Sequence, residues 1–350
     1  MTTISEVAAR AGVGVGTVSR VLNQSSQVSP ATRDRVLAAI EDLGYAPVRG
    51  TAKGRRDQGG FVGVLVHFFD GPSCYQRLRG IVTSLQPHGF EVVLDIVDSP
   101  ERAAARLMEL PTDRRLDGLI VMSLPIGDAA GERLAGARFP TVLLDTWHPA
   151  LPSVTIDDVE GGRISTRHLA DLGHDRIAFV GEPPGDPFGF VASTDRERGY
   201  RDVLGERGLQ LSDDLVKHGP HLRASGRQMA LELFAHARPP TAIVAASDQH
   251  ALGVLEAARD SRRRLPRDLS VIGFDDIEMA SYVGLSTIRQ PLELSGERAA
   301  SILLSTLQHG ERPTPYREPL PLELIIRSTS GPAPVSATAG NRRRPARRAS

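Results

Sequence analysis

Apolar residues recur every three or four positions along the first 45 residues, a spacing typical of amphipathic helices. Two groups have this spacing: Ile4, Val7, Ala8 and Ala11, and Val15, Val18, Val21 and Leu22. A third helix is predicted to begin at Ser29-Pro30 and to end at Gly44, with a buried face of Val36, Leu37, Ile40 and Leu43. Gly12 would end the first helix in a left-handed turn. The pattern therefore predicts three short helices.

From Phe61 onward the pattern changes to continuous apolar runs, as expected of strands that are covered on both faces. The runs are Phe61–Val66, Phe90–Val97, Leu116–Met122, Thr141–Leu144, Arg176–Val180, Ala242–Ala246 and Leu269–Phe274. Amphipathic stretches between them include Tyr75–Gln86, Val159–Leu172, Asp195–Arg207, Ser225–Ala235 and Asp248–Ser261. This alternation predicts α/β lobes with parallel, doubly wound sheets. About 270 residues exceed one core, so we expect two lobes.

Composition and charge narrow the class of protein. The 350 residues contain 42 Lys+Arg and 42 Asp+Glu. Residues 1–60 nevertheless hold eight cations and five acids, and the last twenty residues hold five arginines and no acid. An acidic body with basic ends is consistent with a polyanion partner at the ends. A single cysteine, Cys74, suits a reducing compartment. With no membrane-length apolar run and no secretory signal at the N-terminus, we expect a cytoplasmic protein without a membrane partner.

The three predicted helices fit two structures. A tight glycine turn between the first two helices is typical of the helix-turn-helix, in which the second helix enters the major groove of DNA. A small helical bundle without a ligand would have the same pattern. Thr3 and Glu6 form a potential capping box at the start of the first helix.

Four blocks favour the DNA-binding interpretation. They are ISEVAARAGV (residues 4–13), TVSRVLN (17–23), VSPATR (28–33) and LGYAP (43–47). In sequence and spacing, these blocks resemble the lactose-repressor (LacI/GalR) family of transcriptional regulators. The body is also similar to this family, in DDVEGG (157–162), HLADLGH (168–174), RERGY (196–200), ASD (246–248), VIGFDD (271–276) and LSTIRQP (285–291).

The resemblance implies a DNA-binding site on the head. Thr17, Ser19 and Asn23 would contact phosphates and Arg20 would read a base, as hydroxyl, amide and guanidinium groups can. We place Thr3, Val15 and Gly16 at the same surface: Val15 could touch a thymine methyl group, whereas Gly16 reads nothing. Gly14 stands where the family usually has a serine, which weakens the start of the second helix.

The linker departs further from the family pattern. The leucine that wedges into the minor groove in relatives falls on Gly54, and glycines disfavour a helix. Lys53 and Arg55 could still track phosphates. We therefore expect the linker to bind DNA with less kinking of the central base step.

The resemblance also implies a domain organisation. Residues 1–48 would be the helix-turn-helix domain, 49–60 the hinge and 61–330 an effector-binding core like that of periplasmic binding proteins. Within the core, the lobes would exchange strands: an N-lobe of about 61–160 and 291–321, and a C-lobe of about 161–290 and 322–330. Residues 331–350 would be a disordered basic tail. The tail has no leucine heptads, so we expect a homodimer.

An effector site is expected beyond the carboxyl ends of the strands. By the family match, Arg196, Ser247 and Asp275 occupy effector-contacting positions, Asp145 joins them, and His221 falls where relatives often place a stacking aromatic. Five aromatic residues near the same strand ends could cover the apolar side of a sugar ring: Phe68, Phe69, Trp147, Phe188 and Phe190. Phe188 and Phe190 lie in a loop, which favours ligand contact over core packing. Asp248 is as easily a helix cap as a ligand contact.

These expectations lead to three hypotheses. The first is a cytoplasmic DNA-binding repressor of carbohydrate-use genes, controlled by a small sugar between the lobes. The second is a solute-binding protein of a sugar transporter, which the N-terminal helices and the missing signal disfavour. The third is a sugar-modifying enzyme, but no nucleophile, metalloprotease or phosphate-loop motif is present. We predict no cofactor, no metal site and no catalytic residue.

Overall fold

The structure is a computed structural model that describes residues 3–22, 27–43, 45, 60–67, 71–310 and 314–334. The expectations for Asn23, Gly44, Lys53, Gly54, Arg55, Phe68 and Phe69, and for the tail from 335 onward, lie outside the described residues. The chain divides into two compact units, residues 1–56 and 57–350. Each unit is described by itself.

The first unit holds three helices: α1 (Ile4–Ala11), α2 (Val15–Leu22) and α3 (Pro30–Asp42). The capping box is present, because Thr3 Oγ1 accepts from the Glu6 amide at 3.3 Å and the Thr3 amide donates to the Glu6 carboxylate at 2.7 Å. Gly12 ends α1 with a φ of 65°. Ser29 caps α3.

A small apolar core holds the three helices together. Its buried members are Val7, Ala8, Ala11, Val18, Val21, Val36 and Ala39. The expected face of α3 was wrong at one position: Leu37 is 50% exposed, and Ala39 faces the core in its place. Leucine is the more hydrophobic residue, but the helical phase favours Ala39, three residues after Val36.

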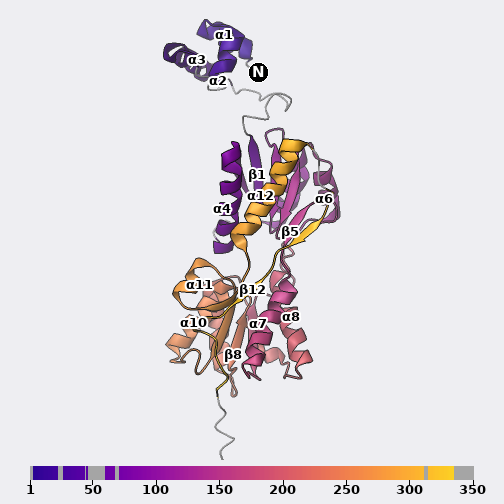
Figure 1. Cartoon of the computed structure of the whole chain (residues 1–350), viewed down its shortest axis with the longest axis vertical. Coiled ribbons are helices and arrows are strands. Elements are labelled where there is room, and N and C mark those ends of the chain that lie inside the picture. The colour runs from indigo at the N-terminus through magenta and orange to yellow at the C-terminus, as the bar shows by residue number, and fades with distance from the viewer. Residues whose placement is uncertain are drawn as a thin grey trace, which may run out of the picture. The chain divides into compact units, whose positions relative to one another are not determined.

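The first lobe of the body contains a six-stranded parallel sheet in the order β11-β5-β4-β3-β1-β2. Its strands are β1 (Phe61–Val66), β2 (Glu91–Ile96), β3 (Gly118–Met122), β4 (Thr141–Leu144), β5 (Ser153–Thr155) and β11 (Arg317–Pro319). Its helices are α4 (Pro72–Leu85), α5 (Pro100–Glu109), α6 (Asp128–Ala135) and α12 (Leu292–His309). Figure 1 shows α4 and α12 side by side on this lobe.

The second lobe contains another six-stranded sheet, in the order β12-β10-β9-β8-β6-β7. Its strands are β6 (Ile177–Gly181), β7 (Val216–His218), β8 (Ala242–Ala245), β9 (Ser270–Asp275), β10 (Ser286–Arg289) and β12 (Glu323–Ile325). Its helices are α7 (Asp158–Asp171), α8 (Ala192–Glu206), α9 (Arg223–Phe234), α10 (Asp248–Asp260) and α11 (Glu278–Tyr282). All pairings are parallel except that of the edge strand β12 with β10. The helical head and the two α/β lobes confirm the predicted fold class.

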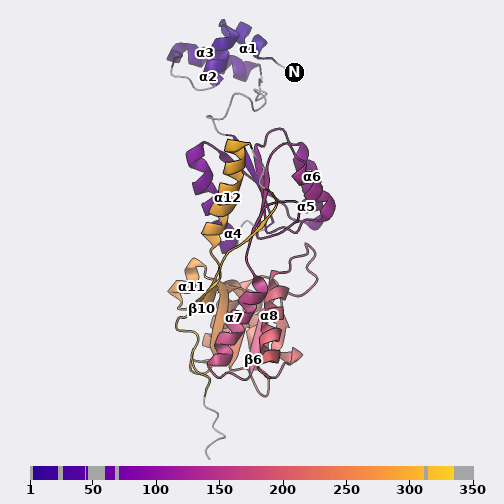
Figure 2. The ribbon, with the colours of Figure 1, turned by 45° about the vertical axis from the view of Figure 1, so that its right-hand side comes forward.

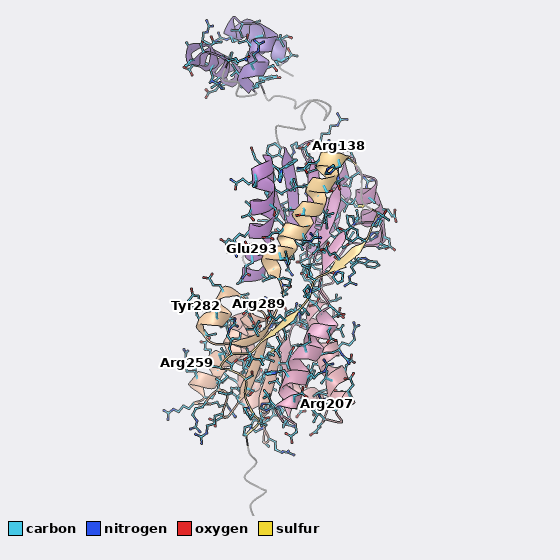
Figure 3. All side chains as sticks on the ribbon, in the orientation of Figure 1. Arg138, Arg207, Arg259, Tyr282, Arg289 and Glu293 are labelled. Atoms are coloured by element: carbon cyan, nitrogen blue, oxygen red, sulfur yellow. The ribbon has the colours of Figure 1, made fainter. Side chains whose placement is uncertain are left out.

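The chain passes between the lobes at three places: between β5 and α7, between β10 and α12, and between β11 and β12. The two views in Figures 1 and 2 show these segments running side by side at the waist of the body. Arg289 and Glu293, which flank the second passage, are labelled in Figure 3. Residues from both lobes therefore meet beside the crossing segments.

Paired glycines bring three helix pairs into backbone contact: α4 with α12, α7 with α8, and α9 with α10. A Cβ atom at any of these glycines would lie 2.0–2.2 Å from a carbonyl oxygen of the partner helix. The pairs are Gly80 and Gly296, Gly162 and Gly199, and Gly226 and Gly253. A larger residue at any of these positions would force the helices apart.

The described residues extend to 334, past residue 330, after which the disordered tail was predicted to begin. The Gly331 carbonyl oxygen lies 3.0 Å from His174 Nε2 and accepts from Ser270 Oγ at 3.1 Å. The Ala333 amide donates to the Leu172 carbonyl at 2.9 Å. Residues 331–334 therefore pack on the second lobe, because their backbone groups find partners there.

Candidate functional site

Arg196, in the second turn of α8, is a buried charge held by several contacts. Its Nε and Nη2 each lie 2.8 Å from Asp158 Oδ1, and its Nη1 donates to the Ala246 carbonyl at 2.6 Å. The guanidinium also lies 3.6 Å above the Phe274 ring. These contacts fix the orientation of a buried fork whose remaining N–H groups can serve a ligand.

Gln290 links polar groups of the two lobes across the second crossing segment. Its Oε1 accepts from Arg77 Nη2 of α4 at 2.8 Å, and its Nε2 donates to Asp275 Oδ1 at 2.5 Å. On the first-lobe side, Asp145 Oδ2 lies 3.0 Å from Arg77 Nη2 and accepts from Ser123 Oγ at 2.9 Å. The structure therefore brings Asp145 and Asp275 into one hydrogen-bonded chain.

Burial raises the pKa of two carboxyl groups in this cluster, those of Asp158 and Asp275. Burial raises the pKa of Asp158 to about 6, although the positive charge of Arg196 lowers it. Burial also raises the pKa of Asp275, against the lowering effect of Arg196 and the hydrogen bond from Gln290. Asp145 and Asp275 adopt positive φ angles of 58° and 119°. A buried carboxyl on strained backbone at a strand end, as at Asp275, is typical of a binding site.

The aromatic residues of the loop after β6 pack on the other lobe. The His67 ring of the first lobe lies 3.8 Å from Phe188 and 5.7 Å from Phe190, centroid to centroid. Both phenylalanines are half-buried against the first-lobe core. Contrary to the expectation from their loop position, the two rings therefore pack against a core, and they bridge the lobes. Trp147 is 50% exposed.

Ser247 and His221 lie at the carboxyl edge of the second sheet. Ser247 caps α10, where its Oγ accepts from the His250 amide at 3.3 Å. Asp248 is not the cap: it is buried, and it accepts from Thr287 Oγ1 at 2.7 Å and from the Ile277 amide at 2.9 Å. His221 Nδ1 is hydrogen-bonded to the Glu182 carboxylate.

Six polar residues of this region were missed by the sequence analysis as site residues: Arg77, Ser123, Asp158, Glu182, His250 and Gln290. Asp158 and Gln290 lie in blocks that resemble the family, so a signal existed for them. Arg77 and Ser123 are joined to the cluster by contacts between residues far apart in the chain, which hydrophobic periodicity does not reveal.

On the head, α2 carries the residues expected to face DNA. Val15 and Arg20 are exposed, and nothing lies within 4 Å of a Cβ built at Gly16. Thr17 and Ser19 are half-buried, and the Thr3 side chain is engaged in the capping box. A helix-turn-helix head and a two-lobed body with a polar site between the lobes together define a ligand-responsive DNA-binding regulator.

Comparison with known proteins agrees with this class. A model of the lacI family of bacterial regulatory proteins matches residues 3–48, and a model of the periplasmic binding protein-like domain matches residues 166–330. The HTH-type transcriptional regulator CelR of Thermobifida fusca is 34% identical over 341 residues, which cover 93% of this chain and 98% of that protein. The ribose operon repressor of Escherichia coli (strain K12) is 30% identical over 332 residues, with coverage of 93% and 98%. The chain belongs to the lacI family of bacterial regulatory proteins.

A solved structure extends the agreement to the whole fold. The lac repressor dimer bound to operator and the anti-inducer ONPF superposes with a TM-score of 0.71 at 30% identity, over 94% of this chain and 99% of that one. Family membership makes the protein a DNA-binding transcriptional regulator and not an enzyme or a transporter subunit, and such a regulator works in the cytoplasm. Among the described residues, no helix is both long and apolar enough to cross a membrane.

Proposed function

We propose that the protein is a homodimeric repressor of carbohydrate-use genes, and that a sugar bound between its lobes controls its affinity for operator DNA. Two relatives support the sugar: one solved structure is a CelR–cellobiose complex, with a TM-score of 0.67 at 34% identity over 94% of this chain and all of that one, and another relative is a ribose operon repressor. The lac repressor structure supports a dimer on operator DNA.

The observation that carries the proposal is the pre-oriented guanidinium of Arg196 beside buried carboxyls. A guanidinium fork and a carboxylate can each engage adjacent sugar hydroxyls in pairs. We assign Arg196, Asp275, Asp145, Ser247 and His221 to the effector site. To these residues we add Gln290, which donates a hydrogen bond to Asp275, and Asp158, which accepts one from Arg196.

Trp147 supplies an exposed aromatic face near the same strand ends, and Phe68 keeps its assignment from the sequence. Phe188 and Phe190 would act at the rim of the site, where they already join the lobes. The mixture of aromatic faces and acids favours a neutral mono- or oligosaccharide over a phosphorylated sugar, which acids would repel.

On the head, we assign base reading to Arg20 and thymine contact to Val15. Thr17, Ser19 and Asn23 would hold phosphates, with Thr3 and Gly16 at the same surface and Lys53 and Arg55 on the linker. Arg20 is exposed on α2, as a base-reading side chain must be.

The effector would act by changing how the lobes close. Gln290 belongs to the second crossing segment and binds Arg77 of one lobe and Asp275 of the other. A sugar that replaces one of these hydrogen bonds would shift the equilibrium between two lobe arrangements. Such coupling between two sites requires a bistable element, which the three crossing segments supply.

The test separates the two sites. Operator fragments from the promoters nearest the gene are titrated by fluorescence anisotropy, with and without a panel of sugars. Arg20→Ala should weaken specific binding by about 1–3 kcal/mol while leaving sugar binding intact. Arg35→Ala, which removes an exposed charge from α3, should weaken specific binding less.

Asp275→Ala should abolish the response to sugar while leaving operator affinity intact. Asp213→Ala, at a carboxylate that is 90% exposed, is its control. The proposal fails if wild-type protein binds no promoter fragment, or if Asp275→Ala responds to sugar like the wild type.

A further inference from the structure

We propose that Glu182, His221 and His250 form a binding site for a divalent transition-metal ion of the zinc type. One ligand atom from each of these side chains lies within 4.8 Å of the other two. No metal site was predicted from the sequence, in which the three residues are spread over 69 positions with no recognisable ligand spacing. The proposal does not depend on which sugar the regulator binds.

The topology of the second sheet explains why the three residues meet. Glu182 directly follows β6, His221 lies three residues after β7, and His250 lies in the first turn of the helix that follows β8. These strands are neighbours in the order β8-β6-β7. Their carboxyl ends therefore bring the three side chains to one edge, and the strands behind them provide a rigid frame.

The buried histidine is oriented by a second contact. His250 is fully buried, and its Nε2 lies 3.0 Å from the Pro220 carbonyl oxygen. A carbonyl only accepts, so this contact places the proton on Nε2 and leaves Nδ1 unprotonated, with a lone pair that faces the Ser247 hydroxyl. Nδ1 lies 3.9 Å from Glu182 Oε2. A ligating histidine that donates its other N–H to a carbonyl is the usual outer support of a metal site.

The remaining contacts are compatible with an ion. His221 Nδ1 is hydrogen-bonded to Glu182 Oε1, and the two imidazole rings are 5.4 Å apart and inclined by 65°. His221 is about two-fifths exposed, so its ring can turn to admit an ion. Ser247 Oγ, 3.1 Å from His250 Nδ1, would lose that contact on metal binding and keep its bond from the His250 amide.

The donor set selects the class of ion. Two imidazoles and one carboxylate suit zinc, cobalt or nickel better than calcium or magnesium, which prefer oxygen donors. Three protein ligands also leave a tetrahedral ion with one open position, as in zinc sites that bind a further ligand. His221 is itself an assigned effector residue, and Ser247, another one, contacts His250, so an ion here would lie within the effector site.

The chain contains a matched control for this site. His218 Nε2 lies 2.7 Å from Glu197 Oε2 on the same lobe, a histidine–carboxylate pair that belongs to no three-ligand group among the described residues. Ordinary weak binding of metal by a surface histidine would involve this pair as readily as the proposed site.

The experiment uses the full-length, tag-free protein after treatment with a chelator. Zinc binding is measured by competition with a chromophoric chelator, and coordination is followed in the visible absorption of added Co²⁺. We expect one tight ion per chain and tetrahedral cobalt bands. Glu182→Gln and His221→Ala should each weaken zinc binding by more than about 100-fold, because loss of even an outer partner typically costs 10–100-fold.

His218→Ala should bind zinc as the wild type does. Circular dichroism checks that each variant is folded, and the partly exposed position of His221 makes its variant the safest for folding. The proposal is overturned if folded wild-type protein takes up no zinc. It is also overturned if Glu182→Gln and His221→Ala retain wild-type affinity, or if His218→Ala loses as much affinity as they do.

Discussion

Replacement of Arg196 by methionine should destabilise the two-lobed body by about 3–5 kcal/mol, the usual cost of removing one partner of a buried ion pair. The guanidinium makes two contacts of 2.8 Å with Asp158 and one hydrogen bond of 2.6 Å to the Ala246 carbonyl. Methionine keeps part of the packing over Phe274 but satisfies neither oxygen partner. Urea unfolding followed by circular dichroism, at fixed protein concentration, measures the loss.

The dependence of stability on pH tests whether the unpaired Asp158 carboxyl causes the loss. Burial raises the pKa of Asp158 to about 6 from an ordinary 3.8, even with Arg196 present. Without Arg196, the folded protein binds this proton more tightly still, whereas the unfolded chain releases it near 3.8. The stability of Arg196→Met should therefore fall as the pH rises from 6 to 8.

The double variant Arg196→Met/Asp158→Asn should recover about 1–3 kcal/mol of the loss, because it removes the unpaired carboxylate, and it should lack this pH dependence. As a surface control, Arg298→Met breaks an exposed pair with Glu318 and should cost less than about 1 kcal/mol, since solvent screens such pairs. A loss in Arg196→Met no larger than in this control would refute the reasoning, as would a double variant no more stable than the single one.

Three further predictions concern stability. Gly199→Ala should lower the free energy of unfolding by about 1–3 kcal/mol, because its Cβ would meet the Val159 carbonyl oxygen. Gly205→Ala on the same helix has open space around its Cβ and should raise the free energy of unfolding by up to about 1 kcal/mol; urea titration measures both changes. Thr3→Ala should destabilise α1 by about 0.5–2 kcal/mol, seen as faster amide exchange in that helix. Burial lowers the pKa of His174 below 6.5, so in acid the unfolded chain binds more protons than the folded protein, and stability should fall as the pH drops through 6.5. His174→Asn should make stability depend less on pH in this range. An unchanged dependence would show that His174 is not the group responsible.

The sequence predicted those features that depend on local pattern. The runs at Phe61–Val66 and Thr141–Leu144 are strands with the predicted bounds, because a strand covered on both faces leaves an uninterrupted apolar signature. The capping box at Thr3 and the glycine at the end of α1 are equally local. The prediction that Leu37 lies in the core was wrong, because its position on the helix, and not its hydrophobicity, decides which face it lies on.

The candidate site could be predicted only in part. Arg196, Ser247 and Asp275 carry a family signature. Ser247 and Asp275 lie at strand ends of the second lobe, and Arg196 of α8 reaches the same edge by its hydrogen bond to the Ala246 carbonyl. Arg77 resembled any other charge on an amphipathic helix, and nothing near it in the sequence indicates its partner 213 positions away. Residues whose role depends on such distant contacts become visible only once the topology is known.

The three helix pairs joined at paired glycines have a consequence for how the lobes move. Helices whose backbones touch have little freedom to slide or tilt, so each lobe should turn as a stiff block. In the proposed mechanism, the three crossing segments would then act as the pivots, and the bound effector would set the angle between the lobes. Loops around the site could change to bind a different metabolite without disturbing the helix pairs, so effector specificity could diversify while the movement of the lobes stays the same.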